Sequence, residues 1–394
     1  MSNASIPVLL PVYKRAEVTF ERGEGAYLYA TDGRRFLDFG SGIAVTALGH
    51  CHPHLVETLG RQAHRLWHVS NLYRIAEQEA LGERLIAHSF ADTAFFANSG
   101  AEALECAIKM ARRYHYERNQ PRRYRIVTFE GAFHGRTMAT ISAGGQAKHL
   151  QGFRPGLEGF DQVPVGDLAR LRAAIGEETA AVLIEPIQGE SGIRAAPAGF
   201  LHELRRVCDE HGLLLIFDEV QCGMGRTGDL FAYQGVGVQP DIMALAKGLG
   251  GGFPIGACLA TARAASGLTT GSHGSTFGGN PLATAVGGAV LDVLLQDGFL
   301  DRVRTMGEVL RTRLEALAAA CPGVITGVRG RGLLLGLELG PANSEVSQRL
   351  LDGGLLTVPA GDNVLRVLPP LIVEEPQIDE AAEILESVCR EFAA

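Results

Sequence analysis

Lysine is scarce in this chain of 394 residues. Of its 36 basic residues, only four are lysines (Lys14, Lys109, Lys148 and Lys247), and the other 32 are arginines. Because arginine supplies nearly all of the positive charge, a lysine inside an apolar, glycine-rich stretch is not expected to be an ordinary surface charge. Lys247 lies in such a stretch, "DIMALAKGLGGGFPIGA" (241–257). Lysine deprotonates readily and reacts with carbonyl groups, which arginine does not, so we expect Lys247 to act as a reactive amine.

Three further absences exclude whole classes of protein. No stretch approaches the roughly 20 consecutive apolar residues of a membrane span. The net charge is −8 and there is no basic stripe, so the chain lacks the charge pattern of a nucleic-acid-binding protein. The seven cysteines are scattered and contain no CxxC pair, which favours reduced thiols. We therefore expect a cytoplasmic enzyme that acts on small molecules and binds neither nucleic acid nor a membrane.

Short apolar runs alternate with helical patterns between residues 93 and 257. Four runs are predicted to be buried strands: 93–97, 124–129, 180–186 and 213–220. Helical patterns are present at 99–114 and 200–212. Strands that are apolar along almost their whole length and alternate with helices indicate an α/β fold, with a mainly parallel sheet covered on both faces. Ligands of such sheets bind beyond the carboxyl ends of the strands.

The pattern changes at about Pro281. A long helix is predicted there, followed by strands amid helices, which indicates a smaller α+β domain. We expect a large domain over residues 48–283 and a small C-terminal domain over 284–394. The N-terminal segment, 1–47, is expected to join the small domain.

Small and polar residues follow the predicted strand at 93–97. Ser99, Gly100 and Ala101 lie between this strand and the next helix, where free backbone N–H groups and the helix dipole favour a phosphate. A plain serine N-cap followed by Glu102 would give the same pattern. The residues alone leave both interpretations open.

Carboxylates follow two other predicted strands. Asp218 and Glu219 end the run at 213–220, and a carboxylate after five buried apolar residues is costly unless it has a fixed cationic or N–H partner. A protonated heteroaromatic nitrogen on a cofactor would be such a partner, and a helix cap or an internal ion pair is the alternative. Glu185 and Glu190 occupy a similar place in "EPIQGESG".

Two loops contribute further candidates. Arg136, in "FEGAFHGRT", suits a substrate carboxylate because its planar guanidinium group binds both oxygens. His134, two residues before it, is expected to be a structural hydrogen-bonding residue. Ser275 and Thr276 add hydroxyl groups in "HGSTFGGNP".

Together these residues predict pyridoxal 5′-phosphate as the cofactor. Lys247 would supply the amine for covalent attachment, and Asp218 would keep the pyridine nitrogen protonated. The stretch from Ser99 to Ala101, with a hydroxyl group from elsewhere, would hold the phosphate.

Two motifs that resemble other kinds of site are set aside. The cluster "GHCHPH" (49–54) has metal-binding residue types, but neighbouring residues of a strand point to opposite faces and no second ligand pair follows. We therefore expect no metal. The glycine-rich stretches 248–256 and 330–336 lack the strand–helix context and the acidic residue of a dinucleotide-binding loop.

The order of motifs closely resembles that of the class III (subgroup II) pyridoxal-phosphate aminotransferases of fold type I, and most of all the bacterial acetylornithine aminotransferases. The matching motifs run almost from end to end: "GAYLYATDGRRFLDFGSGIAVTALGHCHP", "NSGAEALECAIKMAR", "FHGRT", "EPIQGESG", "FDEVQCGMGRTG", "LAKGLGGGFPIGA", "STFGGNPLA" and "VLRVLPPL". The resemblance implies a mainly parallel, seven-stranded type of sheet between helices. One departure is Leu104, in "EALE" where relatives usually have "EANE", and no catalytic consequence is expected.

The resemblance also implies the cofactor contacts. Lys247 forms a Schiff base with the cofactor and then moves the substrate proton, and Asp218 pairs with the pyridine N–H. The other implied contacts are Gln221 with the phenolic oxygen, Phe133 and Val220 with the two ring faces, Ser99, Gly100 and Ala101 with the phosphate, and Glu219 beside Asp218. In relatives the residue matching Thr276 arrives from the partner subunit, so a homodimer with shared active sites is implied.

Substrate contacts follow from the same resemblance. Arg136 is expected to bind the carboxylate far from the reacting amine, and Arg366 the α-carboxylate of 2-oxoglutarate or glutamate. Glu190 is expected to pair with Arg366 when the amino donor has no carboxylate there. Ile43, where ornithine δ-aminotransferases carry a tyrosine, suits an acylated nitrogen better than an ammonium group. Two further expected substrate contacts are Tyr13 and Ser275.

The implied reaction converts N2-acetyl-L-ornithine and 2-oxoglutarate to N-acetyl-L-glutamate 5-semialdehyde and L-glutamate, a step of arginine biosynthesis. The alternatives are succinylornithine, 4-aminobutyrate and lysine-type ω-aminotransferases, with N-succinyl-LL-2,6-diaminoheptanedioate as a possible second substrate. A nicotinamide dehydrogenase is disfavoured by the missing glycine fingerprint. A cofactor-free binding protein is disfavoured by the presence of both Lys247 and Asp218.

Overall fold

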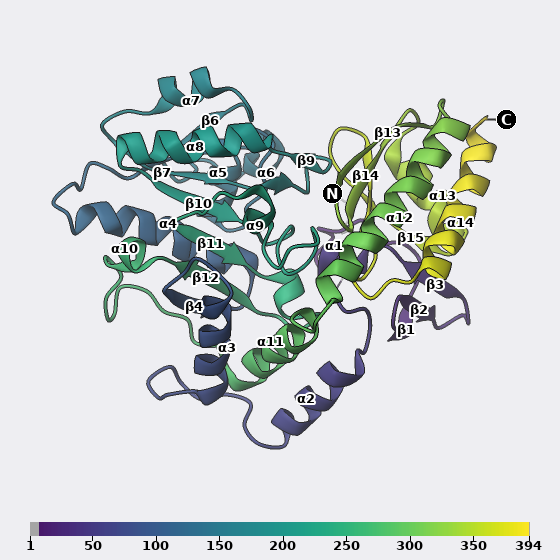
Figure 1. The fold of residues 1–394 in the computed structure, drawn as a ribbon, viewed down its shortest axis with the longest axis horizontal. Helices are drawn as coiled ribbons and strands as arrows, with labels where there is room; N and C mark the ends of the chain where they lie inside the picture. The colour runs from purple at the N-terminus through teal and green to yellow at the C-terminus, as the bar shows by residue number, and fades with distance from the viewer. Residues whose placement is uncertain (1–7, 394) are drawn as a thin grey trace, which may run out of the picture.

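A computed structural model describes residues 8–393 (Figure 1). The predicted central sheet is present and has seven strands in the order β4-β12-β11-β10-β7-β5-β6. Their bounds are β4 Thr93–Ala97, β5 Arg125–Phe129, β6 Phe160–Val163, β7 Thr179–Ile184, β10 Leu214–Asp218, β11 Ile242–Leu245 and β12 Gly256–Ala260. Neighbouring strands pair in parallel except at β12, which is antiparallel to both β4 and β11. The predicted α/β fold with a mainly parallel sheet is confirmed.

Helices cover both faces of this sheet. They include α4 Gly100–Tyr116 and α5 Met138–Gly144 on one face, and α8 Ala198–His211 and α11 Pro281–Leu294 on the other. Leu214 and Ile216 of β10 pack in one cluster with α4 and α5, whereas Leu215 and Phe217 pack in the cluster that contains α8 and α11. Burying each side chain of this kind is worth about 1.5–3 kcal/mol. A strand buried on both faces must be apolar throughout, which is why the pattern was readable in the sequence.

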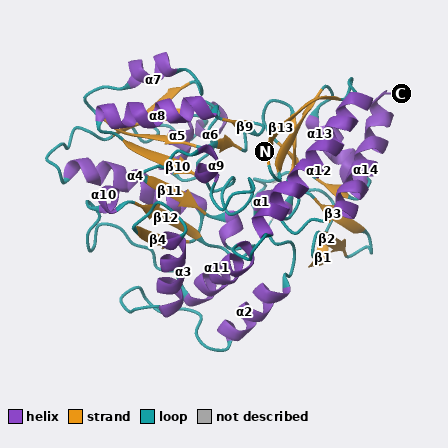
Figure 2. Ribbon diagram, in the orientation of Figure 1, coloured by secondary structure: helices purple, strands orange, loops and turns teal. Residues whose placement is uncertain are grey.

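The C-terminal part of the chain forms a second unit beside the large sheet, at the right of Figures 1 and 2. Its antiparallel sheet has the order β13-β14-β17-β16. The bounds are β13 Ile325–Arg331, β14 Leu334–Leu339, β16 Val358–Pro359 and β17 Val364–Val367, with helices α12 Phe299–Ala320, α13 Asn343–Asp352 and α14 Glu375–Ala393. The N-terminal strands are β1 Phe20–Glu24, β2 Tyr27–Ala30 and β3 Arg35–Asp38, and β3 pairs with β15 Leu355–Leu356. This pairing supports an N-terminal segment that joins the small domain, although residues 1–7 lie outside the described residues.

The long helix predicted from Pro281 is in fact two helices, α11 and α12. The break between them ends at Gly298, whose φ of +78° suits glycine. α11 packs against α2 (Pro53–Ala63) and α3 (Ala76–Ala87), which belong to the large domain, so a boundary at 283 would separate this helix from its neighbours. We propose that the division between the domains falls between α11 and α12.

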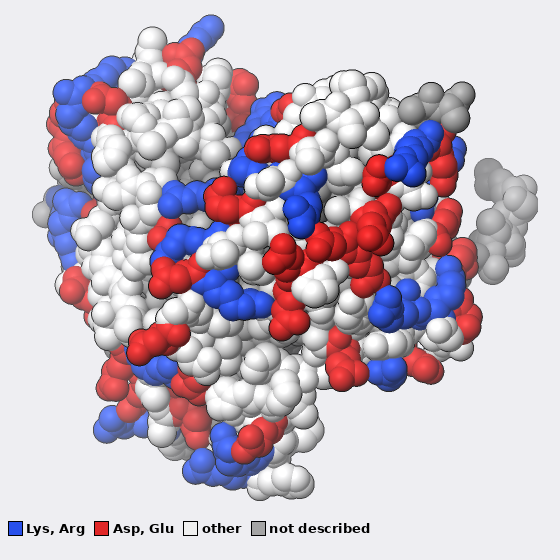
Figure 3. All heavy atoms as spheres, turned by 45° about the vertical axis from the view of Figure 1, so that its right-hand side comes forward, with Lys and Arg blue, Asp and Glu red and all other residues white. Residues whose placement is uncertain are grey.

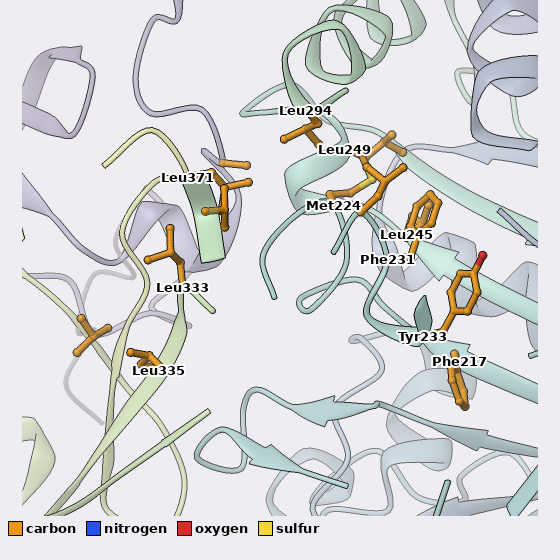
Figure 4. Packing of buried hydrophobic residues seen from close by; sticks show 14 of the residues in the cluster. Phe217, Met224, Phe231, Tyr233, Leu245, Leu249, Leu294, Leu333, Leu335 and Leu371 are labelled. Atoms are coloured by element: carbon orange, nitrogen blue, oxygen red, sulfur yellow. The ribbon is translucent and has the colours of Figure 1, made fainter. Parts of the chain in front are cut away.

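The two domains share one hydrophobic core (Figure 4). It contains Phe217 and Leu245 of the large sheet, continues through Met224, and reaches Leu333 and Leu371 of the small domain. This continuous packing fixes the position of β17 relative to β10. Residues that follow or belong to these two strands can therefore meet at a defined distance.

Basic and acidic side chains are interspersed over the face seen in Figure 3, without a continuous basic stripe. Within residues 8–393, no single helix is long and apolar enough to cross a membrane, and α11 and α12 meet that test only together, across a bend of 73°. In the same part of the chain, no group of three His, Cys, Asp or Glu residues is arranged to hold a metal ion.

The short helix α1 (Ser41–Ala44) is left-handed. Its four residues have φ angles of 47°, 59°, 68° and 62° in chain order. Its backbone hydrogen bonds span four residues: Ala44 N donates to Gly40 O at 3.1 Å, and Val45 N donates to Ser41 O at 2.7 Å. A left-handed helix costs L-residues roughly 1–2 kcal/mol each, and three of these four residues are not glycine. Other contacts must hold such a turn in place.

Candidate active site

A cavity of about 320 Å³ lies beyond the carboxyl ends of the parallel strands. Residues that follow β4, β5, β7, β10 and β11 line it, as expected for the ligand site of such a sheet. Most of the predicted cofactor-binding residues are among them: Ser99, Gly100, Ala101, Phe133, Asp218, Val220, Gln221 and Lys247. The fold brings together side chains that lie far apart in the sequence.

Lys247 has a strained backbone just after β11. It begins the 3-10 helix η1 (Lys247–Leu249) with a φ of +42°, which is uncommon for residues other than glycine. Strained backbone of this kind gathers at functional sites. Burial lowers the pKa of the Lys247 amine to about 8, although the nearby negative charge of Glu190 acts in the opposite direction. More of this amine is therefore neutral and nucleophilic near neutral pH than for an exposed lysine.

Asp218 is fixed by two hydrogen bonds at the end of β10. Its Oδ2 atom lies 2.8 Å from Nδ1 of His134, and its Oδ1 atom accepts a hydrogen bond from Val220 N at 3.0 Å. An ionised carboxylate only accepts hydrogen bonds, so the ring nitrogen of His134 is the donor. The predicted structural role of His134 agrees with this contact, which orients the Asp218 carboxylate in the wall of the cavity.

Glu219 does not line the cavity, and its predicted contact with the cofactor stays a prediction. Its carboxylate accepts hydrogen bonds from Ala232 N at 2.5 Å and Tyr233 N at 2.7 Å, at the start of α9 (Ala232–Val236). Burial raises the pKa of Glu219 to about 8 despite these two bonds. Glu219 therefore makes the helix cap that was the alternative for this pair of acids.

The N-terminus of α4 opens into the cavity. Ser99 is its N-cap and accepts a hydrogen bond from Glu102 N at 3.3 Å, so the capping interpretation is correct. Ser99, Gly100 and Ala101 also line the cavity, so capping and anion binding are compatible here. A Cβ atom on Gly100 would lie 2.8 Å from Cγ1 of Val220, so only glycine allows the helix end to approach this side chain.

Ser275 and Thr276 do not line this cavity. Ser275 accepts a hydrogen bond from the Asn98 side chain at 3.2 Å, behind the N-terminus of α4, and Thr276 is exposed on the same loop. The prediction that Thr276 serves a partner subunit's site is compatible with this exposure and stays a prediction.

Glu190 and Arg366 form a closed ion pair, although they are 176 positions apart. Nη1 of Arg366 lies 2.5 Å from Oε1 of Glu190, and Nη2 lies 3.2 Å from Oε2. Nη1 also donates to the side-chain oxygen of Gln221 at 3.2 Å, which connects the pair to the cavity. Burial raises the pKa of Glu190, but the charge of Arg366 and its hydrogen bonds outweigh this and lower it below its ordinary value.

The remaining predicted substrate residues lie outside the cavity. Arg136 is exposed, with its guanidinium carbon 5.4 Å from the centre of the Phe133 ring. Ile43 lines a separate groove with Lys14, Arg15, Val358 and Pro359 among others. Tyr13, next to Lys14, is exposed. A single chain therefore does not bring Tyr13 or Ile43 into the cavity itself.

Glu185 is a cavity residue to which the sequence assigned no role. It is buried and accepts a hydrogen bond from Phe133 N at 3.0 Å. Burial and the charge of Asp218 raise the pKa of Glu185 well above its usual range. The signal was present, because Glu185 directly follows a strand of six buried residues, just as Asp218 ends a buried strand of five.

The residues of the cavity fit pyridoxal 5′-phosphate. The lowered pKa of Lys247 suits bond formation with an aldehyde, and the oriented carboxylate of Asp218 suits a protonated ring nitrogen. The N-terminus of α4, lined by Ser99, Gly100 and Ala101, suits a phosphate.

Known proteins were compared with the whole chain. The family model for class III aminotransferases matches residues 11–389. The acetylornithine aminotransferase of Brucella melitensis is 60% identical over 379 residues, 96% of this chain and 94% of that protein. The acetylornithine aminotransferase of Agrobacterium fabrum is 59% identical over 394 residues, 100% of this chain and 98% of that protein.

Solved structures agree with these matches. The ornithine aminotransferase of Toxoplasma gondii has a TM-score of 0.94 at 31% identity, covering 98% of this chain and 93% of its own. The N-acetylornithine aminotransferase of Stenotrophomonas maltophilia has a TM-score of 0.85 at 39% identity, covering 97% and 98%. With a family match that spans almost its entire length, the chain belongs to the class III aminotransferases, which depend on pyridoxal 5′-phosphate.

Proposed function

We propose that this enzyme transfers the δ-amino group of N2-acetyl-L-ornithine to 2-oxoglutarate in arginine biosynthesis. The products are N-acetyl-L-glutamate 5-semialdehyde and L-glutamate. Relatives of 55–60% identity named acetylornithine aminotransferases support this donor. The observation that carries the proposal furthest is the closed pair between Glu190 and Arg366, because it explains how one site takes two different substrates.

The cofactor, when bound, supplies an electron sink that stabilises negative charge on the substrate carbon. Lys247 would hold it covalently, and its amine, whose pKa burial lowers to about 8, is suited to take up and return the substrate proton near neutral pH. Asp218, oriented by His134, keeps the ring nitrogen protonated. Phe133 and Val220 line the cavity and would exclude water from the bound group.

The ion pair allows an exchange of partners. Acetylornithine has no carboxylate beside its δ-amino group, so Arg366 stays paired with Glu190 when this donor binds. Glutamate and 2-oxoglutarate carry an α-carboxylate, which can replace the Glu190 carboxylate on the guanidinium group with the same two-pronged geometry. Arg366 is almost fully buried and Glu190 is partly exposed, so the glutamate is the partner that can move.

Ile43 supports an acylated donor over free ornithine. An ammonium group near this position would lose water without gaining an acceptor from the isoleucine side chain. An amide carries no charge and tolerates an apolar neighbour. No particular contact favours the succinylornithine, 4-aminobutyrate or lysine-type alternatives.

We also propose a homodimer with shared active sites. Large apolar side chains are exposed on two loops: Leu66, Trp67, Leu72, Tyr73 and Phe277. The two loops are joined by Asn71, whose side chain donates to the carbonyls of Ser275 at 3.1 Å and Gly278 at 3.0 Å. Exposed apolar side chains on two loops joined in this way are typical of a protein interface. Thr276 lies on one of these loops, so a second copy bound here would receive its hydroxyl group.

Mixing two inactive variants tests the shared site. A Lys247→Ala subunit paired with a Thr276→Ala subunit contains one site with both residues intact, provided that Thr276 serves its partner. Activity should therefore reappear after the two are mixed and reassembled. Continued inactivity would mean that each site uses its own Thr276. Trp67→Glu should yield monomers in light scattering, with Tyr116→Glu, exposed on α4, as the matched control.

All seven cysteines are free, and five of them are buried. Free buried thiols persist in reducing compartments, which supports the cytoplasm as the place of action.

Kinetics with a panel of donors test the substrate. Acetylornithine, succinylornithine, ornithine and 4-aminobutyrate would each be supplied with 2-oxoglutarate, and kcat/KM would be compared. We expect acetylornithine to exceed ornithine by at least about tenfold, which is 1.4 kcal/mol of differential binding. A higher kcat/KM for free ornithine or 4-aminobutyrate would overturn the proposed donor without affecting the family assignment.

A further inference from the structure

The left-handed turn α1 (Ser41–Ala44) is an unusual element next to the cavity. L-residues visit this conformation as single residues and not as helices. Strained backbone of this type persists where the surroundings fix it, and such places are often functional. The contacts that fix the turn therefore also determine where its own side chains lie.

Asp38, at the end of β3, is the first anchor. Its Oδ1 atom accepts hydrogen bonds from Gly40 N at 2.9 Å and Ser41 N at 2.8 Å, and its Oδ2 atom lies 2.8 Å from Nε2 of His50. Asp38 is buried, so both carboxylate oxygens are used in fixed directions. The imidazole of His50 thus orients the carboxylate, and the carboxylate orients the start of the turn.

Ser41 provides the second anchor. Its hydroxyl group donates to Leu368 O at 2.7 Å, and Leu368 N donates to Phe39 O at 2.6 Å. Leu368 lies two residues after Arg366. A Cβ atom on Gly40 would lie 3.0 Å from Cγ2 of Val358, which pairs with Arg366 across β16 and β17. The turn is therefore set against the strand that carries Arg366.

The turn and the residue after it present side chains to both the cavity and the groove. Val45, one residue after it, lines the cavity that holds Lys247. Ile43 lines the neighbouring groove, and so does Pro359, whose carbonyl accepts a hydrogen bond from Arg366 at 3.3 Å. A shift of the turn would therefore move Val45 in the cavity and Ile43 in the groove together.

The same contacts explain part of the histidine cluster at 49–54. Nε2 of His50 faces Asp38, whereas Nε2 of His54 faces Asp292 at 2.8 Å on the surface. The two imidazoles therefore serve different carboxylates. His54 does not contact the turn and offers a matched control within the same motif.

We propose that Asp38 and His50 are positioning residues for the amino donor. They hold the left-handed turn so that Val45 faces the cavity and Ile43 lines the groove that takes the acylated end of the donor. Arg366 keeps its contacts with Gln221 and Pro359 when Glu190 is displaced, so glutamate binding depends less on the turn. This inference rests on the proposed function for the identity of the donor.

Single-turnover absorbance measurements on the cofactor-loaded enzyme test this positioning role, because they follow each half-reaction separately. Asp38→Ala and His50→Ala should raise the apparent dissociation constant of the donor by about tenfold, since small displacements of positioning groups have large effects. The glutamate half-reaction should stay within about twofold. Asp38→Asn keeps an oxygen for Gly40 N and Ser41 N and should restore most of the donor affinity. His54→Ala should behave as the wild type.

Equal losses in both half-reactions, in proportion to a lowered melting temperature, would make Asp38 and His50 merely structural and overturn the proposal. An unchanged donor affinity in both alanine variants would overturn it as well. Should Asp38→Ala fail to fold, the milder His50→Ala carries the test. The comparison uses whichever donor the wild-type enzyme prefers, so a wrong assignment of the donor would appear in the wild type and not in the variants.

Discussion

Asp218 and Glu219 are neighbours at the end of one strand, and both are almost fully buried, yet their side chains point in opposite directions. Asp218 faces the cavity and contacts His134 at 2.8 Å. Glu219 faces away and caps α9 through Ala232 N and Tyr233 N. Successive residues of an extended chain point to opposite sides, so the motif "FDEV" supplies one acid to each side of the sheet.

The difference teaches how a buried acid is assigned a role. Each carboxylate must be compensated for lost water, and the compensating group determines what the acid does. Backbone N–H groups satisfy Glu219 permanently, which leaves it nothing to exchange with a ligand. Asp218 lies in a wall with open space beside it, so a ligand can become its partner. Amide substitutions at the two positions separate these roles.

The largest effect is expected for Asp218→Asn. The neutral amide cannot hold the pyridine nitrogen protonated, so the substrate carbanion loses its electron sink. Several kcal/mol of transition-state stabilisation would be lost, which corresponds to about 10³-fold or more in rate. Single-turnover rates, with circular dichroism and cofactor absorbance as controls for folding and loading, measure this. Near wild-type turnover with the cofactor bound would refute the assigned role.

Glu190→Gln should have an intermediate and one-sided effect. Removing one partner of a buried ion pair typically costs a few kcal/mol, and here the cost falls on the state in which acetylornithine is bound. The donor half-reaction should slow, while the glutamate half-reaction holds or improves because Arg366 is free for its α-carboxylate. Specificity should move toward α-amino acids. Equal slowing of both halves would argue against the exchange of partners.

The smallest effect on turnover is expected for Glu219→Gln, which should stay within about twofold because the side chain touches no ligand. Its signature is in the pH dependence of stability. The folded pKa of about 8 lies above the unfolded value of roughly 4.3, so the folded state holds an extra proton between them. The stabilisation is complete below the unfolded pKa and is lost as pH rises toward 8. The free energy of unfolding, measured with denaturant from pH 5 to 8.5, should fall less steeply with pH in the glutamine variant than in the wild type. An identical slope in the two proteins would show that Glu219 does not cause this pH dependence.

The large sheet was predictable because burial on both faces leaves a continuous apolar run. β4 matches its predicted bounds, and β10 lies within the predicted run at 213–220. β6, β11 and β12 were not predicted. β6 is "FDQV", which is half polar because the strand lies at the edge of the sheet, and β12 is "GACLA", whose small residues give a weak signal. Helix α11 looked continuous with α12 because a break of only four residues, 295–298, changes the hydrophobic pattern little.

The residue types of the site were predictable from the sequence, but the directions in which their side chains point were not. The motif that contains Asp218 and Glu219 does not reveal which acid faces the cavity, since that depends on the register of the strand end. Nothing in "SGIA" signals a left-handed turn, because only one of its four residues is glycine. Thr276 lies outside the cavity of a single chain, and sequence patterns within one chain do not describe a second copy.

The central claim is that Lys247 carries the cofactor, and chemical trapping tests it most directly. Reduction of the loaded enzyme with borohydride, followed by peptide mapping, should find the pyridoxyl group on Lys247, whose pKa is lowered to about 8 by burial. The other three lysines are internal controls in the same digest. An adduct on Lys14, Lys109 or Lys148, with Lys247 unmodified, would contradict the account.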